Sequence, residues 1–352
     1  MKTTYIVTGG TGFLGGHIVR QLTDRGERVI ILARCHEKLA KTLPETTATV
    51  VYGTIMKPHD IEVLFERADE RATLERRASA GEAEDQRGVK CDDSRNRILM
   101  IHTASVVYLG GNKDDLHHMR DTNIEGTKNI IDACLKHGAR MVYISSVHAI
   151  PELPNFEQIT EVTEFDPERV HGHYAKSKAE ATKAVMYATV MRGLDAVVVH
   201  PSGITGPGDP SNTHLTRMVE DFKKGKIPAA VDGGYDFVDV RDVATGTIAA
   251  ADLAKSGECF ILSGGYYTVR QVLDTLAELG AGRSPRMTVP LWTAKAGLPF
   301  LMCGYAIRGK KPLFSRYSLY TLGSNGNFSH QKATDQLDYH PRSLKDSLRD
   351  ML

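Results

Sequence analysis

Cysteine is scarce in this sequence, and its few copies form no recognisable pattern. The chain of 352 residues contains five cysteines, an odd number with no CxxC pair among them. Irregular cysteines in odd number predict neither a disulfide framework nor a zinc site. No carboxylate lies at metal-ligand spacing from His148, His171 or His173, so we expect no bound metal. Reduced thiols of this kind are typical of a cytoplasmic protein, which is the location we expect.

The sequence also lacks an excess of charge and a long hydrophobic run. Lysine and arginine total 44 against 43 aspartate and glutamate residues, which leaves a formal net charge of +1. The longest apolar stretch near the C-terminus, Ala296 to Ile307, is broken by glycines and a proline and is shorter than the ~20 residues that span a bilayer. The apolar run at the N-terminus is interrupted by Gly9 and Gly10, so it does not resemble a signal peptide. We therefore expect no nucleic acid partner and no stable membrane insertion.

Short apolar runs alternate with segments of helical periodicity from the N-terminus onward. This alternation is typical of a parallel β-sheet covered by helices on both faces. The predicted strands are Thr4 to Val7, Arg28 to Leu32, Ala48 to Tyr52, Ile98 to His102, Met141 to Ile144 and Ala196 to Val199. The predicted helices are Phe13 to Arg25, Pro58 to Glu66, Asn123 to His137 and His173 to Arg192. Three of these helices are followed by a glycine at the expected C-cap, namely Gly26, Gly138 and Gly193.

Two segments interrupt the alternation. In Glu66 to Arg97, 17 of 32 residues are charged, which indicates a solvated insertion in a loop or an exposed helix. The eleven residues that begin at Pro201 contain three prolines and three glycines, which marks a loop and a change of domain. We expect one domain over residues 1–200 and a second over residues 201–352. Residues 237–262, which include two further apolar runs, are expected to return to the first domain's sheet.

Glycines are regularly spaced between the first predicted strand and the first predicted helix. Gly9, Gly12 and Gly15 form a GxxGxxG pattern. In a Rossmann fold the first glycine allows a tight turn, the second lets a pyrophosphate approach the backbone, and the third lets the helix pack on the strand. Amides at the helix start then bind the anion. We predict a doubly wound parallel Rossmann sheet with a smaller C-terminal substrate-binding domain, and a dinucleotide held by Gly9, Thr11, Gly12, Phe13, Leu14 and Gly15.

An arginine follows the second predicted strand, where NAD-binding folds offer an acidic side chain to the adenosine ribose. The guanidinium of Arg34 can instead bind the 2′-phosphate of NADP through charge-assisted hydrogen bonds. The alternative is a solvated arginine at a strand end. We therefore expect NADP as the cofactor, with NAD as the other candidate.

A tyrosine and a lysine four residues apart share one face of a predicted helix. Tyr174 and Lys178 form a YxxxK pattern, in which the lysine charge and a nicotinamide cation would lower the phenol's pKa. Ser145 and Ser146 follow a predicted central strand, at the sheet edge where ligands bind. One serine hydroxyl can hold a substrate carbonyl against Tyr174. The alternatives are a structural tyrosine on an exposed helix and serines that cap a turn.

These segments occur together in one order, and they resemble a known family. TGGTGFLG, NIEGTKN, YISSVHA, YAKSK and HPSGITGPGD resemble the extended short-chain dehydrogenase/reductases over nearly the whole chain. Within them the chain is most similar to the NAD(P)-dependent epimerase/dehydratase family, in its dihydroflavonol 4-reductase-like group. The resemblance implies that Ser146, Tyr174 and Lys178 are catalytic. It also implies that Lys178 binds the nicotinamide ribose.

The same resemblance assigns five further positions. Asn123 matches a helix position associated with the active-site proton relay. Thr103 and Ala104 match the strand end on the nicotinamide side, and Pro201 with Ser202 matches the loop that lines the nicotinamide.

Three features depart from the family pattern. Thr54 stands where an aspartate usually contacts the adenine, and His200 replaces a frequent arginine. The charged insertion is longer than the family usually shows. In addition, Val147 and His148 stand where sugar-nucleotide dehydratases carry an Asp-Glu pair, which disfavours a dehydratase.

The favoured hypothesis is an NADP(H)-dependent oxidoreductase that interconverts a carbonyl and a secondary alcohol on a small molecule. A second hypothesis is an NAD(P)-dependent sugar-nucleotide epimerase, in which the same residues oxidise and then reduce one carbon. A third is a non-catalytic redox sensor that binds NADP, although such sensors tend to lose the Tyr174 and Lys178 pair. A homodimer is left open.

Overall fold

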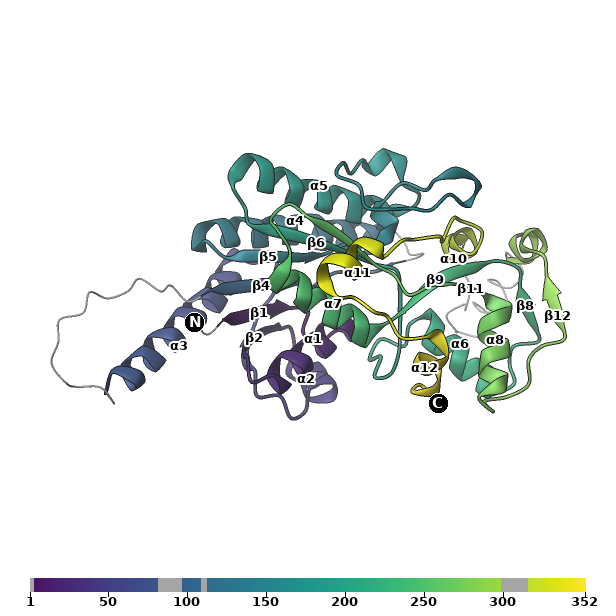
Figure 1. Ribbon diagram of the computed structural model, residues 1–352, viewed down its shortest axis with the longest axis horizontal. Helices are drawn as coiled ribbons and strands as arrows, with labels where there is room; N and C mark the ends of the chain where they lie inside the picture. Colours follow the sequence, from purple (N-terminus) through teal and green to yellow (C-terminus); the bar gives the residue numbers. More distant parts are fainter. Residues whose placement is uncertain (1–2, 82–96, 109–112, 299–315) are drawn as a thin grey trace.

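The computed structural model of the chain describes residues 3–81, 97–108, 113–298 and 316–352, with the backbone alone for residues 71–81. Its centre is a seven-stranded sheet in which every pair of neighbouring strands is parallel (Figure 1). In spatial order the strands are β10 (Cys259–Leu262), β6 (Ala196–Pro201), β5 (Arg140–Ile144), β4 (Ile98–His102), β1 (Thr4–Thr8), β2 (Arg28–Ala33) and β3 (Thr49–Tyr52). The expected doubly wound parallel sheet is thereby confirmed.

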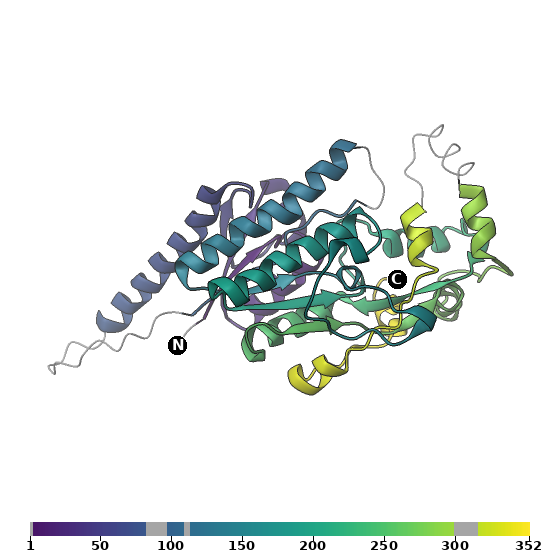
Figure 2. The same ribbon diagram turned by 90° about the horizontal axis from the view of Figure 1, so that it is seen from above.

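Both faces of this sheet are covered, and this explains its nearly continuous apolar strands. All five residues of β1 are buried, with Ile6 packed on one face and Val7 on the other. One face is covered by α3 (Pro58–Gly81), α4 (Lys113–His137) and α5 (His173–Arg192), which lie side by side in Figure 2. The opposite face is covered by α1 (Phe13–Asp24), α2 (His36–Thr42), α7 (Val240–Leu253) and α11 (Gln331–Leu337).

The six predicted strands are all present, but two helices are longer than expected. Helix α3 runs to Gly81 instead of ending at Glu66, and α4 begins at Lys113 instead of Asn123. The extension of α3 follows from its composition, since the run after Glu66 is rich in alanine, glutamate and arginine and contains no glycine or proline before Gly81. The rest of the charged insertion, residues 82–96, lies outside the described residues.

The three predicted C-cap glycines have the conformation that favours glycine at this position. The φ angles of Gly26, Gly138 and Gly193 are +73°, +61° and +74°. A left-handed residue at the helix end lets the chain turn sharply into the next strand. The helix ends at these positions could therefore be placed from the sequence alone.

The part after Pro201 builds two small sheets and a third core cluster. One small sheet has the order β11 (Tyr266–Thr268), β9 (Gly234–Asp239), β7 (Gly203–Thr205), and the other pairs β12 (Met287–Val289) with β8 (Ala229–Val231). The third cluster joins α6 (His214–Lys223), α8 (Val269–Glu278) and α12 (Leu344–Arg349). Helix α10 (Arg316–Thr321) also belongs to this part.

One of the two expected returns to the main sheet is correct and the other is wrong. Strand β10 pairs in parallel with β6 in the main sheet, as expected for Glu258 to Leu262. The run Phe237 to Val240 does not reach that sheet. It lies in β9, which pairs with β7 and β11 and passes directly into α7. Val238 and Val240 are buried in the cluster that contains α7, whereas Phe237 packs against the third cluster. Sequence pattern cannot distinguish such burial from burial in the main sheet.

The strand order fixes where a ligand can bind. The chain goes from β1 to β2 and β3 on one side, and then from β4 to β5, β6 and β10 on the other. In such sheets the crevice outside the carboxyl ends of the strands, at this point of reversal, is the ligand site. Several of the predicted functional residues follow β1, β4, β5 and β6 directly.

Candidate active site

The glycine turn after β1 has the geometry of a dinucleotide cradle. Gly9 has a φ of +73°, and its carbonyl accepts a hydrogen bond of 2.8 Å from the amide of Gly12. Gly12 is the N-cap of α1 without any side-chain cap, and the first turn of α1 contains no acidic residue. A Cβ atom on Gly15 would overlap the carbonyl of Gly9. The turn therefore presents backbone amides and a helix start to a pyrophosphate, which is the fit that the cofactor requires.

The strand end that was expected on the nicotinamide side lies directly against this turn. A Cβ on Gly9 would be 2.6 Å from Oγ1 of Thr103 and 2.7 Å from the amide nitrogen of Ala104. The Thr103 hydroxyl donates a 2.7 Å hydrogen bond to the carbonyl of Thr8, which ties the end of β4 to the end of β1. The structure thus brings Thr103 and Ala104 to the cradle, as predicted.

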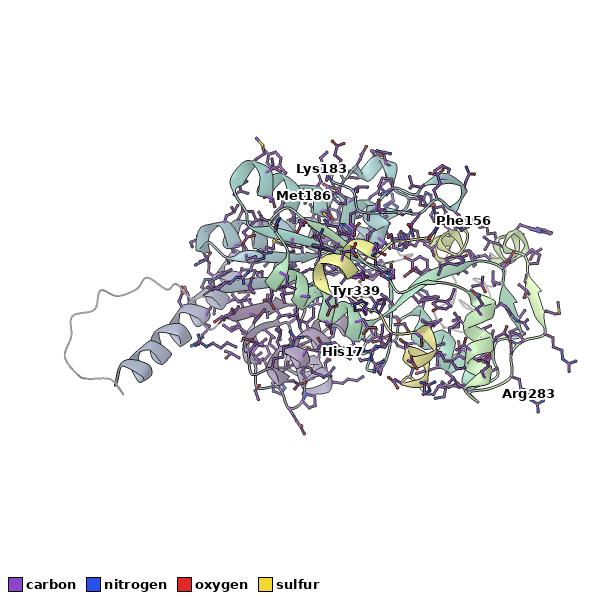
Figure 3. All side chains as sticks on the ribbon, viewed as in Figure 1. His17, Phe156, Lys183, Met186, Arg283 and Tyr339 are labelled. Atoms are coloured by element: carbon purple, nitrogen blue, oxygen red, sulfur yellow. The ribbon has the colours of Figure 1, made fainter. Side chains whose placement is uncertain are left out.

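Helix α1, which follows the glycine turn, is hydrogen-bonded to the loop after Pro201. His17 of α1, labelled in Figure 3, has its Nε2 3.1 Å from the carbonyl oxygen of Pro207. Burial lowers the pKa of His17, so this imidazole is neutral at neutral pH and can donate that hydrogen bond as its Nε2–H tautomer. The contact holds the loop beside the helix start.

Arg34 lies immediately after β2 with an exposed side chain. Within the described residues its guanidinium forms no hydrogen bond or ion pair. It is thus available to a ligand at this sheet edge. At the neighbouring strand end, where an aspartate was missing from the family pattern, the carboxylate of Asp60 accepts a 2.8 Å hydrogen bond from the amide of Thr54.

The predicted catalytic residues converge at the carboxyl end of β5. Lys178 is buried, and its ammonium donates a 2.7 Å hydrogen bond to the carbonyl of Ile144, the last residue of β5. Its Nζ also lies 5.1 Å from the centre of the Tyr143 ring. Tyr174, one helical turn before Lys178, has its phenol beside the hydroxyl of Ser146. Residues from α5 and from the β5 end therefore form one group.

The two serines after β5 have different roles. The hydroxyl of Ser145 is 2.7 Å from that of Thr182 on α5, and both are buried. This pair links the strand to the helix and leaves Ser145 away from the reacting group. The Ser146 hydroxyl accepts a 3.3 Å hydrogen bond from the His148 amide and faces Tyr174. Ser146, which the resemblance implies to be catalytic, is thus the serine in contact with Tyr174, whereas Ser145 is paired with Thr182.

Burial sets the pKa values of Tyr174 and Lys178 among the protein's own groups. We expected the charge of Lys178, together with a nicotinamide cation, to lower the pKa of Tyr174. Within the protein alone, burial raises the pKa of Tyr174 to about 12, and the contact with Ser146 offsets this only in part. Burial also lowers the pKa of Lys178 to about 7. In both groups the loss of hydration disfavours the charged form.

Asn123 is fully occupied by structural hydrogen bonds. Its Oδ1 accepts from the Ser105 hydroxyl and the Val106 amide at 3.1 and 2.8 Å. Its Nδ2 donates to the Val106 carbonyl at 2.9 Å and to the Ser177 hydroxyl at 3.1 Å. The side chain fixes the segment after β4 against α5, and it contacts neither Tyr174 nor Lys178 through these bonds.

The segment after β6 is held in place by a buried aspartate that the sequence analysis did not identify. The Ser202 hydroxyl donates to Oδ1 of Asp236, which also accepts from the Gly264 amide at 3.1 Å. Burial raises the pKa of Asp236 to about 6. Pro201 and Ser202 are both buried at this strand end. Asp236 has no sequence signal of its own, because its role depends on the pairing of distant strands.

A pocket of about 280 Å³ opens beside the catalytic group. His148 and Tyr235 line it. The ring of His148 lies edge-on to that of Tyr174, and the Tyr235 hydroxyl is hydrogen-bonded to His148. The remaining lining residues are Val147, Ile150, Glu152, Glu168, Arg169, Val170, His171, Tyr320, Ser324, Asn325 and Phe328. His171 stacks on Tyr320 with ring centres 4.0 Å apart. The sequence placed His148 near the site, but it gave no signal for Tyr235.

Some aromatic residues after Pro201 do not contribute to the described part of the pocket. Trp292 is 72% exposed and does not line the pocket. Phe300, Tyr305 and Phe314 lie outside the described residues.

Neither a metal-ligand cluster nor a membrane-spanning helix occurs in the part of the chain that the structure describes. There, no three histidine, cysteine, aspartate or glutamate side chains are grouped closely enough to hold an ion. The described helices all fall short of the length and apolar character that crossing a bilayer requires.

Comparison with known proteins agrees with this geometry. Residues 6–271 match the sequence profile of the 3-beta hydroxysteroid dehydrogenase/isomerase family. Sterol demethylase protein B of Methylococcus capsulatus is 28% identical over 361 residues, which cover 99% of this chain and 96% of that protein. A Synechocystis protein provisionally named dihydroflavonol 4-reductase is 27% identical over 360 residues, covering 99% and 94%.

A solved structure extends the similarity to the whole fold. The crystal structure of gox2253 superimposes on this chain with a TM-score of 0.76 and 27% sequence identity. The superposition covers 99% of this chain and 97% of the other. Both the main sheet and the part after Pro201 are therefore shared.

Proposed function

Because the chain belongs to the 3-beta hydroxysteroid dehydrogenase/isomerase family, within the extended short-chain dehydrogenase/reductases, we propose that this NAD(P)-dependent oxidoreductase reduces a carbonyl on a small molecule with NADPH. The observation that carries the proposal is the convergence of Tyr174, Ser146 and Lys178 at the end of β5. Both the segment between β5 and α5 and the part after Pro201 supply substrate contacts in this proposal, since both line the pocket.

Tyr174 acts as the proton donor. Burial keeps its pKa well above neutral, so the phenol holds its proton at working pH. As the substrate carbonyl is reduced, its oxygen gains negative charge and accepts that proton. The Ser146 hydroxyl, next to the phenol, donates a hydrogen bond to the same oxygen and aligns it. A protonated phenol favours reduction, whereas oxidation of an alcohol requires the phenolate.

The cradle fits a nicotinamide dinucleotide. Amides at the start of α1 bind the pyrophosphate, and Thr103 and Ala104 bound the space next to Gly9. Lys178, whose ammonium lies at the carboxyl end of β5, binds the nicotinamide ribose in this proposal. When bound, the nicotinamide supplies the hydride.

Arg34 selects the phosphorylated cofactor in this proposal. We expect Arg34→Ala to weaken NADPH binding about tenfold to a hundredfold, the size of a charge-assisted hydrogen bond, and to leave NADH binding unchanged. Fluorescence titration of both nucleotides measures the two constants. Arg25→Ala, which removes an exposed arginine at the end of α1, is the matched control. Equal losses for both nucleotides in Arg34→Ala would exclude the proposed selectivity.

The protonation of Tyr174 predicts opposite pH profiles for the two directions of reaction. As pH rises toward the pKa of Tyr174, the phenol loses its proton, so the rate of carbonyl reduction falls and the rate of alcohol oxidation rises. Initial rates at saturating cofactor, recorded in both directions from pH 6 to the alkaline limit of stability, test this. Profiles that change in the same direction would rule out a shared phenol as the donor and acceptor.

A substrate panel separates this function from the two other hypotheses. Ketones, aldehydes and sugar nucleotides are each mixed with NADPH, and nicotinamide absorbance is followed together with product formation. A reductase consumes NADPH steadily. An epimerase converts a sugar nucleotide without a net change in absorbance, and a redox sensor converts none of the panel.

A further inference from the structure

Three aromatic side chains gather next to Tyr174, and two of them, His148 and Tyr235, line the pocket. The ring of His148 has its centre 6.2 Å from Tyr174, 5.6 Å from Tyr235 and 5.7 Å from Tyr317. The Tyr235 hydroxyl lies 2.7 Å from Nε2 of His148. These residues come from η1 (Val147–Ala149), β9 and α10, so the cluster forms only in the folded chain.

Two glycines make room for the two tyrosines. Gly172 is the N-cap of α5 with a φ of +96°, and a Cβ there would overlap the ring of Tyr317. Gly203 follows the nicotinamide loop, and a Cβ there would be 2.8 Å from the Tyr235 ring. Any side chain at Gly172 or Gly203 would overlap the tyrosine ring next to it. Both tyrosines are therefore seated against backbone that leads directly into the predicted site residues.

Two polar atoms of this cluster form no hydrogen bond within the described residues. The Tyr317 hydroxyl is buried and has no hydrogen-bond partner among the described residues. His148 uses Nε2 for Tyr235, and within the described part of the chain its Nδ1 forms no hydrogen bond. A buried hydroxyl without a partner is costly, unless a ligand or a water molecule supplies one.

The cluster carries no charge of its own. Burial lowers the pKa of His148 to about 4 and raises the pKa values of Tyr235 and Tyr317, so at neutral pH all three are uncharged. Negative charges act on both tyrosines. The carboxylate of Glu152 accepts a 2.7 Å hydrogen bond from Tyr320, and its charge contributes to the raised pKa values of both tyrosines; that of Asp236 also acts on Tyr235. Arg169 is a cation that lines the same pocket but is not part of the cluster. At the cluster itself an anionic group would lose its hydration beside two carboxylates.

We propose that Tyr317, Tyr235 and His148 form a second polar pole of the active site, which binds an uncharged oxygen substituent of the substrate close to the reacting carbonyl. The pole selects substrates with a second hydroxyl or keto group over plain ketones and over keto acids. This inference rests on the proposed function, since it assumes that the reacting carbonyl lies at Tyr174.

Three small methyl ketones test the pole by binding, two of them isosteric and the third anionic. Butanone, hydroxyacetone and pyruvate share a methyl ketone and differ in the group attached to the carbonyl. Their affinities for the protein saturated with NADP⁺ are measured by saturation-transfer NMR, which needs no turnover. We expect hydroxyacetone to bind about tenfold more tightly than butanone, the size of one neutral hydrogen bond in a desolvated site, and pyruvate to bind most weakly.

Removing single hydroxyls shows whether these residues cause the preference. We expect Tyr317→Phe and Tyr235→Phe each to lower the ratio of hydroxyacetone to butanone affinity severalfold toward one. Tyr187→Phe, at a 61% exposed site on α5, is the control and should keep the ratio. Each variant loses one oxygen atom only, and circular dichroism confirms its fold.

The possible outcomes separate this inference from the proposed function. Equal affinities for the two neutral probes, tightest binding of pyruvate, no binding of any probe, or an unchanged ratio in both variants would each overturn the inference. If hydroxyacetone is preferred and the variants lose the preference, but the wild type oxidises no NADPH with any substrate of the panel, the pole stands and the reductase function is wrong. If the wild type consumes NADPH with a substrate of the panel but shows no preference for hydroxyacetone, the reductase function stands and the inference is wrong.

Discussion

Replacing Tyr174 with phenylalanine is expected to lower kcat about a thousandfold while NADPH binds with unchanged affinity. The variant removes only the hydroxyl that donates the proton, and positioned proton donors contribute about a hundredfold to ten-thousandfold to rate. The ring and its contact with His148 remain, so the site keeps its shape. Steady-state rates with the best substrate of the panel, together with NADPH titration, measure the two effects.

The Tyr187→Phe protein is the control for this result as well, since it removes a hydroxyl from the exposed side of the same helix. It should retain wild-type kcat. Turnover by Tyr174→Phe within tenfold of wild type would show that another group supplies the proton. Loss of NADPH binding would show instead that the phenol is needed for the cofactor.

The second large effect concerns the cradle. Gly9→Ala is expected to weaken NADPH binding about a hundredfold, which corresponds to one lost charge-assisted hydrogen bond to the pyrophosphate, and also to destabilise the fold. The new Cβ would lie 2.7 Å from the Ala104 amide nitrogen and 2.8 Å from its Cα, both in backbone that cannot rotate away. The turn must therefore shift, and the amides at the start of α1 shift with it.

Gly26→Ala separates the effect of space from the effect of backbone strain. Gly26 has the same φ of +73°, but nothing lies within 4 Å of the position that its Cβ would take. Both variants are subject to the cost of about 1 to 2 kcal/mol for an L-residue in the left-handed region. Only Gly9→Ala should add the loss of cofactor affinity and a further drop in thermal stability. Equal behaviour of the two variants would mean that the cradle tolerates a side chain.

Those parts of the site that follow strands in sequence could be predicted before the structure. The cradle glycines, Thr103 and Ser146 each come directly after a buried strand, and parallel strands bring such positions to one edge of the sheet. Tyr174 and Lys178 could be paired because their spacing fits one helix face. Local pattern and a general rule about sheets were sufficient for these residues.

Other parts of the site depend on contacts between segments that are distant in the chain. Which of these segments pack together could not be predicted from the sequence. Tyr317 reaches His148 only because α10 packs over the start of α5, where Gly172 leaves space. Asp236 holds Ser202 because β9 pairs with β7. The burial that raises the pKa of Tyr174 could not be predicted either, because the degree of burial cannot be judged from a YxxxK pattern.

The most direct test of the central claim follows the hydride into the product and uses Tyr174→Phe to remove the proton donor. NADPH that carries deuterium at both C4 positions of the nicotinamide is oxidised by the wild-type protein with the best substrate, and the alcohol product is examined by mass spectrometry and NMR. We predict one deuterium at the carbinol carbon, one NADPH consumed for each alcohol formed, and neither result with Tyr174→Phe. Product that forms without deuterium, or without consumption of NADPH, would contradict the assignment of this site as a carbonyl reductase.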